Sequence, residues 1–433
     1  MRERWALVVA SLAVFALIAG IGSLATTPTD GAGASPATSD RSTADGASNG
    51  RFATLHAAGV TGENVSVGVV DPTGFDVRRG GLRAHVAETR AFGPRALRAG
   101  DDDHGTAAAR VLARTAPDAD LYLARVDGVD SYRRAVDWLL AEGVDVVVAP
   151  VAFYGQPGDG TGAVARATTR AANEGVVFVA PTGNLADSHW SGRYDAETAA
   201  NGTVLFANDS RRNFVRGDTE MTVWLSWDRD GRDEDYTAEL YRTNGTVSRL
   251  VARSQPYRAD AVPNERIVAD VEPGSYYLVV RGPAEPTGTR VRLVSPTHEF
   301  QHAVADGSVV APGTARGAVT VGAYNSRVDR VEPYSSRGPT ADGRVGVDLV
   351  APDRRFADAS ASGFVGSSAA APYVGGVAAL LLDAEPSLSP RRAALLLELT
   401  ARDVGRPGID TATGHGEVTP VRAVRAATNE TAT

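Results

Sequence analysis

Residues 65–71 read VSVGVVD, an apolar run that ends in a carboxylate. Short apolar runs bounded by turn residues are typical of strands that are buried on both faces of a parallel sheet. Similar runs alternate with helical stretches along the chain, and this alternation predicts an α/β fold, with helices on both faces of a parallel sheet. The expected strands are 120–126, 144–151 and 176–180, and the expected helices lie near 131–142 and 161–174.

Four polar side chains lie at strand ends or helix starts. Asp71 and Asn184 follow strands, where ligands of parallel α/β sheets bind. His104 begins a helix in DHGTAAARVL, and Ser368 begins an apolar helix in GSSAAAP. A serine nucleophile needs a base, a histidine can be that base, a carboxylate orients the imidazole, and an amide N–H stabilises an oxyanion. Alone, each is more often a turn or capping residue. Together they favour nucleophilic catalysis.

At these four motifs the chain resembles the subtilase family of serine endopeptidases, because the order Asp, His, Ser is the subtilisin order. The resemblance implies that Asp71, His104 and Ser368 form a catalytic triad. It also implies that the side chain of Asn184 stabilises the oxyanion together with the backbone N–H of Ser368. The implied activity is hydrolysis of peptide bonds in polypeptide substrates.

All three triad motifs depart from the family pattern in part, and two of the departures lie directly beside a predicted catalytic residue. Pro72 precedes Thr73-Gly74, where the family usually goes directly from Asp to a small residue and Gly. Ser367 precedes the nucleophile, where Thr is more common. Neither change removes a reacting atom, so they concern local geometry and specificity.

The resemblance covers two segments, 51–190 and 304–424, which we expect to form one catalytic domain. By the same resemblance, residues 149–155 pair with the substrate as an added strand. No charged residue lies in 149–155 or 180–183, which favours neutral or apolar side chains at P1, the residue on the carbonyl side of the scissile bond. The implied substrate-binding residues are Ala180, Pro181, Thr182, Gly183 and Gly155.

Residues 191–303 have a different pattern, with short alternating strands separated by turn signals. Such spacing predicts an antiparallel β-sandwich inserted into the catalytic domain. It resembles the pre-peptidase C-terminal type of β-sandwich. We expect an accessory module that positions large substrates and is not needed for small ones. The expected strands include 222–227, 236–241, 266–271 and 276–280.

Two stretches suggest metals. The acidic run Asp228–Asp235 has alternate carboxylates at a Gly turn, which suits calcium, but a solvated hairpin is the favoured interpretation. Residues 298–302 read HEFQH, the zinc-peptidase pattern, which needs a helix to place both imidazoles on one face. Pro296 and Gly307 leave little room for that helix. We therefore expect no cofactor and no metal site, and a zinc peptidase using His298 and His302 is an alternative function.

The N-terminal segment, residues 1–26, is predicted to attach the protein to a membrane. Residues Trp5–Ala25 carry no charge and are long enough to span a bilayer. Arg2 and Arg4 favour a cytoplasmic N-terminus, which puts the catalytic domain outside. Cleavage near Ala25, giving a secreted protein, is the alternative. Residues 27–50 are expected to be a flexible linker and 425–433 a tail.

Composition limits the remaining functions. The 433 residues carry a net charge of −8, with no Lys, so all 44 basic residues are Arg. This acidic balance argues against nucleic acid as a partner. The chain has no Cys, which excludes cysteine nucleophiles and thiolate metal sites. A non-catalytic surface scaffold that keeps the subtilase fold is a further alternative.

The excess of carboxylates and the absence of Lys predict adaptation to salt. Dense counterions screen repulsion between carboxylates. Activity and the midpoint of thermal unfolding should therefore both be highest well above about 0.1 M salt, where the Debye length is about 10 Å. A salt titration checks this, and maxima below that concentration would contradict it.

Overall fold

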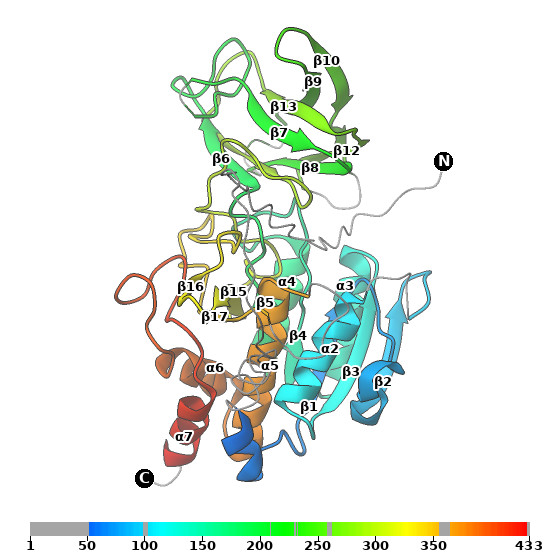
Figure 1. Ribbon diagram of the computed structural model, residues 1–433, viewed down its shortest axis with the longest axis vertical. Coiled ribbons are helices and arrows are strands. Elements are labelled where there is room, and N and C mark those ends of the chain that lie inside the picture. The colour runs from blue at the N-terminus through cyan, green and yellow to red at the C-terminus, as the bar shows by residue number, and fades with distance from the viewer. Residues whose placement is uncertain are drawn as a thin grey trace, which may run out of the picture.

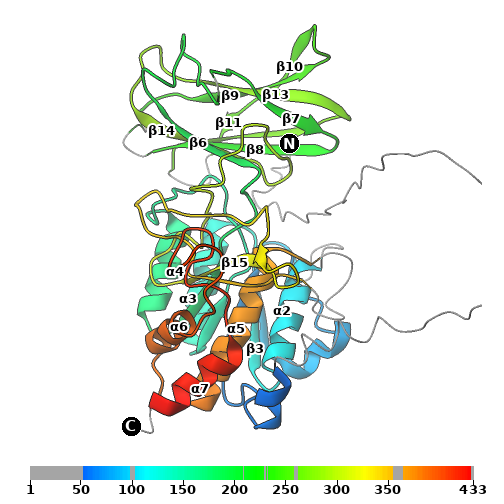
Figure 2. The same ribbon diagram turned by 60° about the vertical axis from the view of Figure 1, so that its left-hand side comes forward.

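The computed structural model describes residues 52–97, 103–207, 209–228, 231, 233–257, 262–354 and 364–430. The predicted membrane segment Trp5–Ala25 and the linker 27–50 lie outside these residues. An α/β unit occupies one end of the long axis, and two antiparallel sheets occupy the other (Figure 1). A view turned by 60° shows the same arrangement (Figure 2).

The α/β unit is built on an eight-stranded sheet of order β16-β15-β5-β4-β1-β3-β2, with β17 also paired to β15. All its strand pairs are parallel except β15 with β16. The predicted strands at 65–71, 120–126 and 176–180 are confirmed, whereas that at 144–151 is shorter. The strands are β1 (Ser66–Asp71), β2 (Val86–Phe92), β3 (Asp120–Val126), β4 (Val146–Val148), β5 (Val177–Pro181), β15 (Val319–Asn325), β16 (Arg330–Val331) and β17 (Leu349–Pro352).

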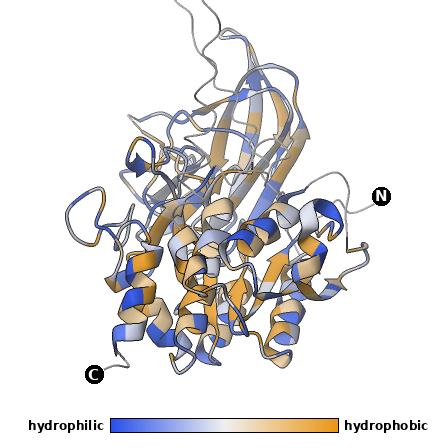
Figure 3. Ribbon diagram, turned by 60° about the horizontal axis from the view of Figure 1, so that its bottom comes forward, coloured by the Kyte–Doolittle hydropathy of each residue, from blue (hydrophilic) through white to orange (hydrophobic). Residues whose placement is uncertain are grey.

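Helices cover both faces of this sheet because successive strand residues point to opposite sides. Val146 and Val148 pack with α2 and α5, whereas Val147 packs with α3 and α4. Figure 3 shows apolar residues concentrated on these strands and on helix faces. The helices are the 3-10 helix η1 (Arg79–His85), α2 (His104–Thr115), α3 (Val129–Ala141), α4 (Ala163–Asn173), α5 (Ser367–Ala384), α6 (Pro390–Leu399) and α7 (Pro420–Glu430).

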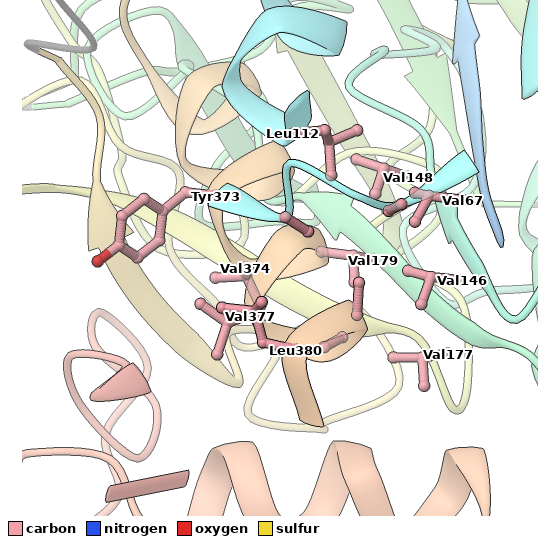
Figure 4. Close-up of a cluster of buried hydrophobic side chains, with 14 of the residues drawn as sticks. Val67, Leu112, Val146, Val148, Val177, Val179, Tyr373, Val374, Val377 and Leu380 are labelled. Carbon is pink, nitrogen blue, oxygen red and sulfur yellow. The ribbon is translucent and has the colours of Figure 1, made fainter. Parts of the chain in front are cut away.

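Helix α5 is the central helix of the larger core. It is long and apolar enough to cross a membrane, but 83% of it is buried inside the protein. A Cβ on Gly375 would lie 2.3 Å from Val148 Cγ2, and one on Gly376 would lie 2.4 Å from Thr115 Cβ. These two glycines therefore allow α5 to approach both the sheet and α2. Figure 4 shows Leu380 of α5 among the valines of the sheet.

The predicted tail at 425–433 begins too early. Helix α7 continues to Glu430, and Ala427 is buried in the same core as α5. Its apolar side chains recur at helical spacing, which places one face of α7 against the protein.

The second part of the structure, which we call the β unit, comprises residues 189–294. Its two sheets have the orders β10-β9-β13-β7 and β11-β12-β8-β14-β6, and they share one core that contains Leu225, Leu240 and Leu278. The predicted strands at 222–227, 236–241, 266–271 and 276–280 are observed with small shifts. An independent inserted domain with limits 191–303 stays a prediction. The strands are β6 (His189–Tyr194), β7 (Asn213–Gly217), β8 (Glu220–Trp227), β9 (Thr237–Thr243), β10 (Ser248–Arg253), β11 (Gln255–Pro256), β12 (Asn264–Asp270), β13 (Gly274–Arg281) and β14 (Thr289–Val294).

Two leucine substitutions test the core around α5. Leu380 is fully buried, whereas Leu399 on α6 is 60% exposed. We expect Leu380→Ala to lower the free energy of unfolding by about 2–5 kcal/mol, because it leaves a cavity. Leu399→Ala should change it by less than about 0.5 kcal/mol. Urea unfolding followed by circular dichroism measures both, and similar losses for the two variants would contradict this assignment of the core.

Candidate active site

Asp71 and His104 form the centre of the site. Asp71 ends β1 and is fully buried. His104 begins α2, and its Nδ1 lies 2.7 Å from Asp71 Oδ2. A carboxylate oxygen accepts at this distance, so Nδ1 carries the proton and Nε2 is left as the basic nitrogen. The pair therefore has the geometry of a base oriented by a carboxylate.

The second oxygen of Asp71 is held by Thr73. Both the backbone N–H and the hydroxyl of Thr73 donate to Asp71 Oδ1, at 2.8 and 2.6 Å. Thr73 Oγ1 also accepts from the backbone N–H of Gly105 at 2.9 Å, which links the aspartate turn to the start of α2. The departure from the family pattern at Pro72 does not affect these bonds. Proline has no backbone N–H, and none of these bonds uses the backbone N–H of residue 72.

Two glycines allow the backbone to pack closely around Asp71. Gly74 has φ +82°, and a Cβ there would lie 1.7 Å from the carbonyl oxygen of Leu97. A Cβ on Gly105 would lie 2.8 Å from Asp71 Cγ. A side chain on Gly105 would therefore push the start of α2 away from Asp71, whereas one on Gly74 would clash with the backbone of Leu97.

Ser367, the residue before the predicted nucleophile, orients Asn184. The backbone N–H and the hydroxyl of Ser367 donate to Asn184 Oδ1, at 3.0 and 3.1 Å. Ser367 Oγ also accepts from Gly183 N at 3.1 Å. The amide oxygen of Asn184 is therefore engaged by Ser367, and its NH₂ group lies beside Gly366. The departure from Thr to Ser at this position keeps the hydroxyl that makes these bonds.

His104, Asn184 and Ser368 all line one small cavity of about 40 Å³. Asp71 lies behind His104, away from the cavity. The structure therefore brings the four predicted catalytic residues together from four separate chain segments. The other lining residues are Pro72, Pro150, Val151, Ala152, Tyr154, Pro181, Gly183, Leu185, Pro296 and Ser367.

The predicted substrate-binding residues are only partly at this cavity. Pro181 and Gly183 line it. Ala180 and Thr182 are fully buried and face the interior, because residues of a strand alternate in direction. Gly155 lies beside Trp224 of the β unit. Ala180, Thr182 and Gly155 therefore do not line the cavity, and Tyr154, Leu185 and Pro296 take their place.

The zinc-peptidase pattern does not have the structure that its chemistry needs. Residues 298–302 form no helix, so His298 and His302 do not share a helix face. His298 Nδ1 lies 2.8 Å from Thr297 Oγ1, and burial lowers the pKa of His298. Across the parts of the chain that the structure describes, no three His, Asp or Glu side chains form a group that fits a metal ion.

The solvated hairpin expected at Asp228–Asp235, with calcium as the alternative, is not tested, since residues 229, 230 and 232 lie outside the described part. The carboxylate of Glu234 accepts hydrogen bonds from Tyr236, Thr287 and Thr289 within the β unit. Asp228 lies 3.7 Å from Arg292.

A buried acidic residue, which the sequence interpretation missed, supports the serine segment. Asp353 is fully buried and accepts from Gly366 N at 3.2 Å and from the hydroxyl of Tyr334. Burial and the charge of Asp353 raise the pKa of Tyr334, so this phenol remains a donor. Gly366 immediately precedes α5, and Asp353 therefore helps to fix where that helix begins. Only the run of apolar residues before Asp353 hinted that it would be buried.

Known proteins share both a sequence pattern and this architecture. The family model described as the subtilase family matches residues 297–416, which include Ser368 but not Asp71 or His104. The CspB protease of Clostridium perfringens is 15% identical, with a TM-score of 0.64 over 89% of this chain and 98% of that one. A protease of Pseudoalteromonas arctica is 18% identical, with a TM-score of 0.50 over 87% and 94%. At these identities the two structures support the fold alone.

Proposed function

We propose that this chain is a serine protease of the subtilase family and that it hydrolyses peptide bonds with Asp71, His104 and Ser368 as its catalytic triad. The match of residues 297–416 to the subtilase family model supports this proposal. The observation that carries the proposal is the Asp71–His104 hydrogen bond of 2.7 Å, formed behind a cavity that Ser368 and Asn184 also line.

In the proposed mechanism, Ser368 Oγ attacks the carbonyl carbon while His104 Nε2 takes its proton. Asp71 stabilises the imidazolium that forms and keeps the ring oriented. The oxyanion accepts hydrogen bonds from the NH₂ group of Asn184 and from the backbone N–H of Ser368. His104 then gives its proton to the leaving amine, and water hydrolyses the acyl-enzyme by the same steps in reverse order.

The proposed location is the outer side of a membrane. It is based on the uncharged segment Trp5–Ala25 and on Arg2 and Arg4 before it. Fractionation distinguishes this from secretion, since activity in the medium on a chain that begins near Thr26 would show cleavage after Ala25.

A serine-directed fluorophosphonate tests the nucleophile, and the neighbouring serine provides the matched control. We expect labelling of the wild-type protein, slower labelling of Ser367→Ala because its lost hydroxyl orients Asn184, and no labelling of Ser368→Ala. Ser367 is buried and hydrogen-bonded to Asn184, so it is not available to the probe. Peptidase activity that survives Ser368→Ala but is lost with a chelator would contradict the proposal and favour the zinc alternative.

Ser368 and His104 act as one unit in this mechanism, so their substitutions should not be additive. Ser368→Ala and His104→Ala should each lower kcat by roughly 10⁴–10⁶, with little further loss in the double variant. Kinetics on a chromogenic peptide measure this. Losses that multiply in the double variant would show that the two residues act independently.

Asn184 acts mainly after charge develops on the substrate oxygen. Asn184→Ala should therefore lower kcat by about 10²–10³ and leave KM nearly unchanged. Steady-state kinetics separate the two constants. If kcat does not change, Asn184 only shapes the loop that contains it.

A further inference from the structure

A small apolar cluster joins the β unit to the wall of the catalytic cavity. Tyr154 and Leu185 belong to the α/β unit and line the cavity. Trp224 of β8 and Val294 of β14 pack with them in one buried cluster. The wall of the cavity therefore packs directly against side chains of the β unit.

Gly155 receives two contacts from the β unit. Its backbone has φ +77°, and a Cβ there would lie 2.7 Å from the indole ring of Trp224. Its carbonyl oxygen accepts a hydrogen bond of 3.1 Å from Asn264 Nδ2, which is buried at the start of β12. A buried carbonyl oxygen needs such a donor. The end of the 150–155 wall is therefore held by Trp224 and Asn264.

Other groups in the β unit hold Trp224 itself in place. The indole is 2% exposed and packs edge-on against Tyr257, with ring centroids 4.9 Å apart. The guanidinium of Arg266 lies over both rings, 5.2 Å from that of Trp224 and 5.4 Å from that of Tyr257. Cation–π contacts of this kind restrict the ring, so Trp224 is a rigid support for the wall.

The segment that leaves the β unit also reaches the cavity directly. Pro296 follows β14 and is one of the residues that line the cavity. Its neighbour Ser295 is fixed by a bond from its N–H to Ser188 O, 2.9 Å, and from its hydroxyl to Thr222 O, 2.8 Å. The β unit thus both supports one wall and supplies part of another.

We infer that the β unit sets the P1 specificity of this protein and restricts P1 to small uncharged side chains. The inference rests on the proposed function. Ser368 and Asn184, which are proposed to act on the scissile carbonyl group, both line the cavity. The substrate side chain that enters the cavity is therefore that of P1, the residue that carries this carbonyl group. Among the described residues that line it, only His104 and Tyr154 have ionisable side chains. A volume of about 40 Å³ holds only a few water-sized groups, at about 10–15 Å³ each. That suits Ala, Ser or Val and not Phe or Arg.

This role differs from the accessory one expected from the sequence. A module that only positions large substrates should leave small-peptide hydrolysis unchanged. If the module instead holds the wall that contacts P1, altering it should change the selectivity for small and large substrates alike, because P1 is next to the scissile bond in both.

Two tryptophans of β8 provide a matched test. Trp224→Phe replaces the indole that packs against Gly155 with a smaller ring. Trp227→Phe makes the same change at a tryptophan that packs in the core of the β unit, and it serves as the control. The readout is kcat/KM on peptides that differ only at P1, with Ala, Val, Leu or Phe, after active-site titration with a fluorophosphonate. The wild-type protein should prefer Ala and Val. Trp224→Phe should raise the ratio for Phe over Ala by about tenfold, since a methylene-sized change in a pocket alters selectivity by about 10–200-fold. Trp227→Phe should leave it within about twofold.

Asn264→Ala serves as a second, milder variant, because it frees the Gly155 carbonyl without removing a large side chain. It should relax P1 selectivity in the same direction as Trp224→Phe. Labelled protein with an unchanged P1 profile in both variants, or a wild-type preference for Phe at P1, would overturn the inference alone. Absence of both labelling and hydrolysis in the wild-type protein would overturn the proposed function and the inference with it.

Discussion

The close packing of α5 against the sheet and α2 determines where Ser367 and Ser368 lie relative to the other proposed catalytic groups. This helix is buried along almost its whole length, and Gly375 and Gly376 let its backbone approach Val148 and Thr115. Its N-terminus therefore cannot move independently of β4 and α2. Ser367 and Ser368 begin that helix, so their positions relative to Asn184 and His104 follow from the packing of the core.

Hydrogen bonds then orient the side chains of the proposed site. Thr73 connects Asp71 to the N-terminus of α2, and Ser367 connects the N-terminus of α5 to Asn184. Each hydroxyl both donates and accepts, so each ties two segments together. Asp353 adds a third link, at Gly366. The proposed catalytic groups are held by side chains that do not themselves react.

The β unit leaves and rejoins the α/β unit at neighbouring points. The backbone N–H of Ser295 bonds Ser188 O at 2.9 Å, so the ends of the β unit lie side by side. When the ends are close, a folded segment can occupy the position of a short loop. That position is next to Asn184 and Leu185, which is why the β unit packs on the wall of the cavity.

The sequence by itself determined the α/β fold class, several strands and the four candidate catalytic positions. The period of apolar residues identifies a buried strand locally, and the motifs around Asp71, His104, Asn184 and Ser368 are each contiguous in the chain. Prediction from the sequence was less reliable where tertiary packing decides the local structure. The strand at 144–151 is shorter than expected, α7 extends into the expected tail, and HEFQH forms no helix.

Only the tertiary structure decided which side chains support the site. Ser367 meets Asn184 across 183 residues and Asn264 meets Gly155 across 109. Such pairs leave no periodic or contiguous signal, because the partners are chosen by how helices and sheets pack and not by neighbours in the chain. The sequence therefore located the groups that are proposed to react, whereas packing determined how they are oriented and which side chains line the cavity.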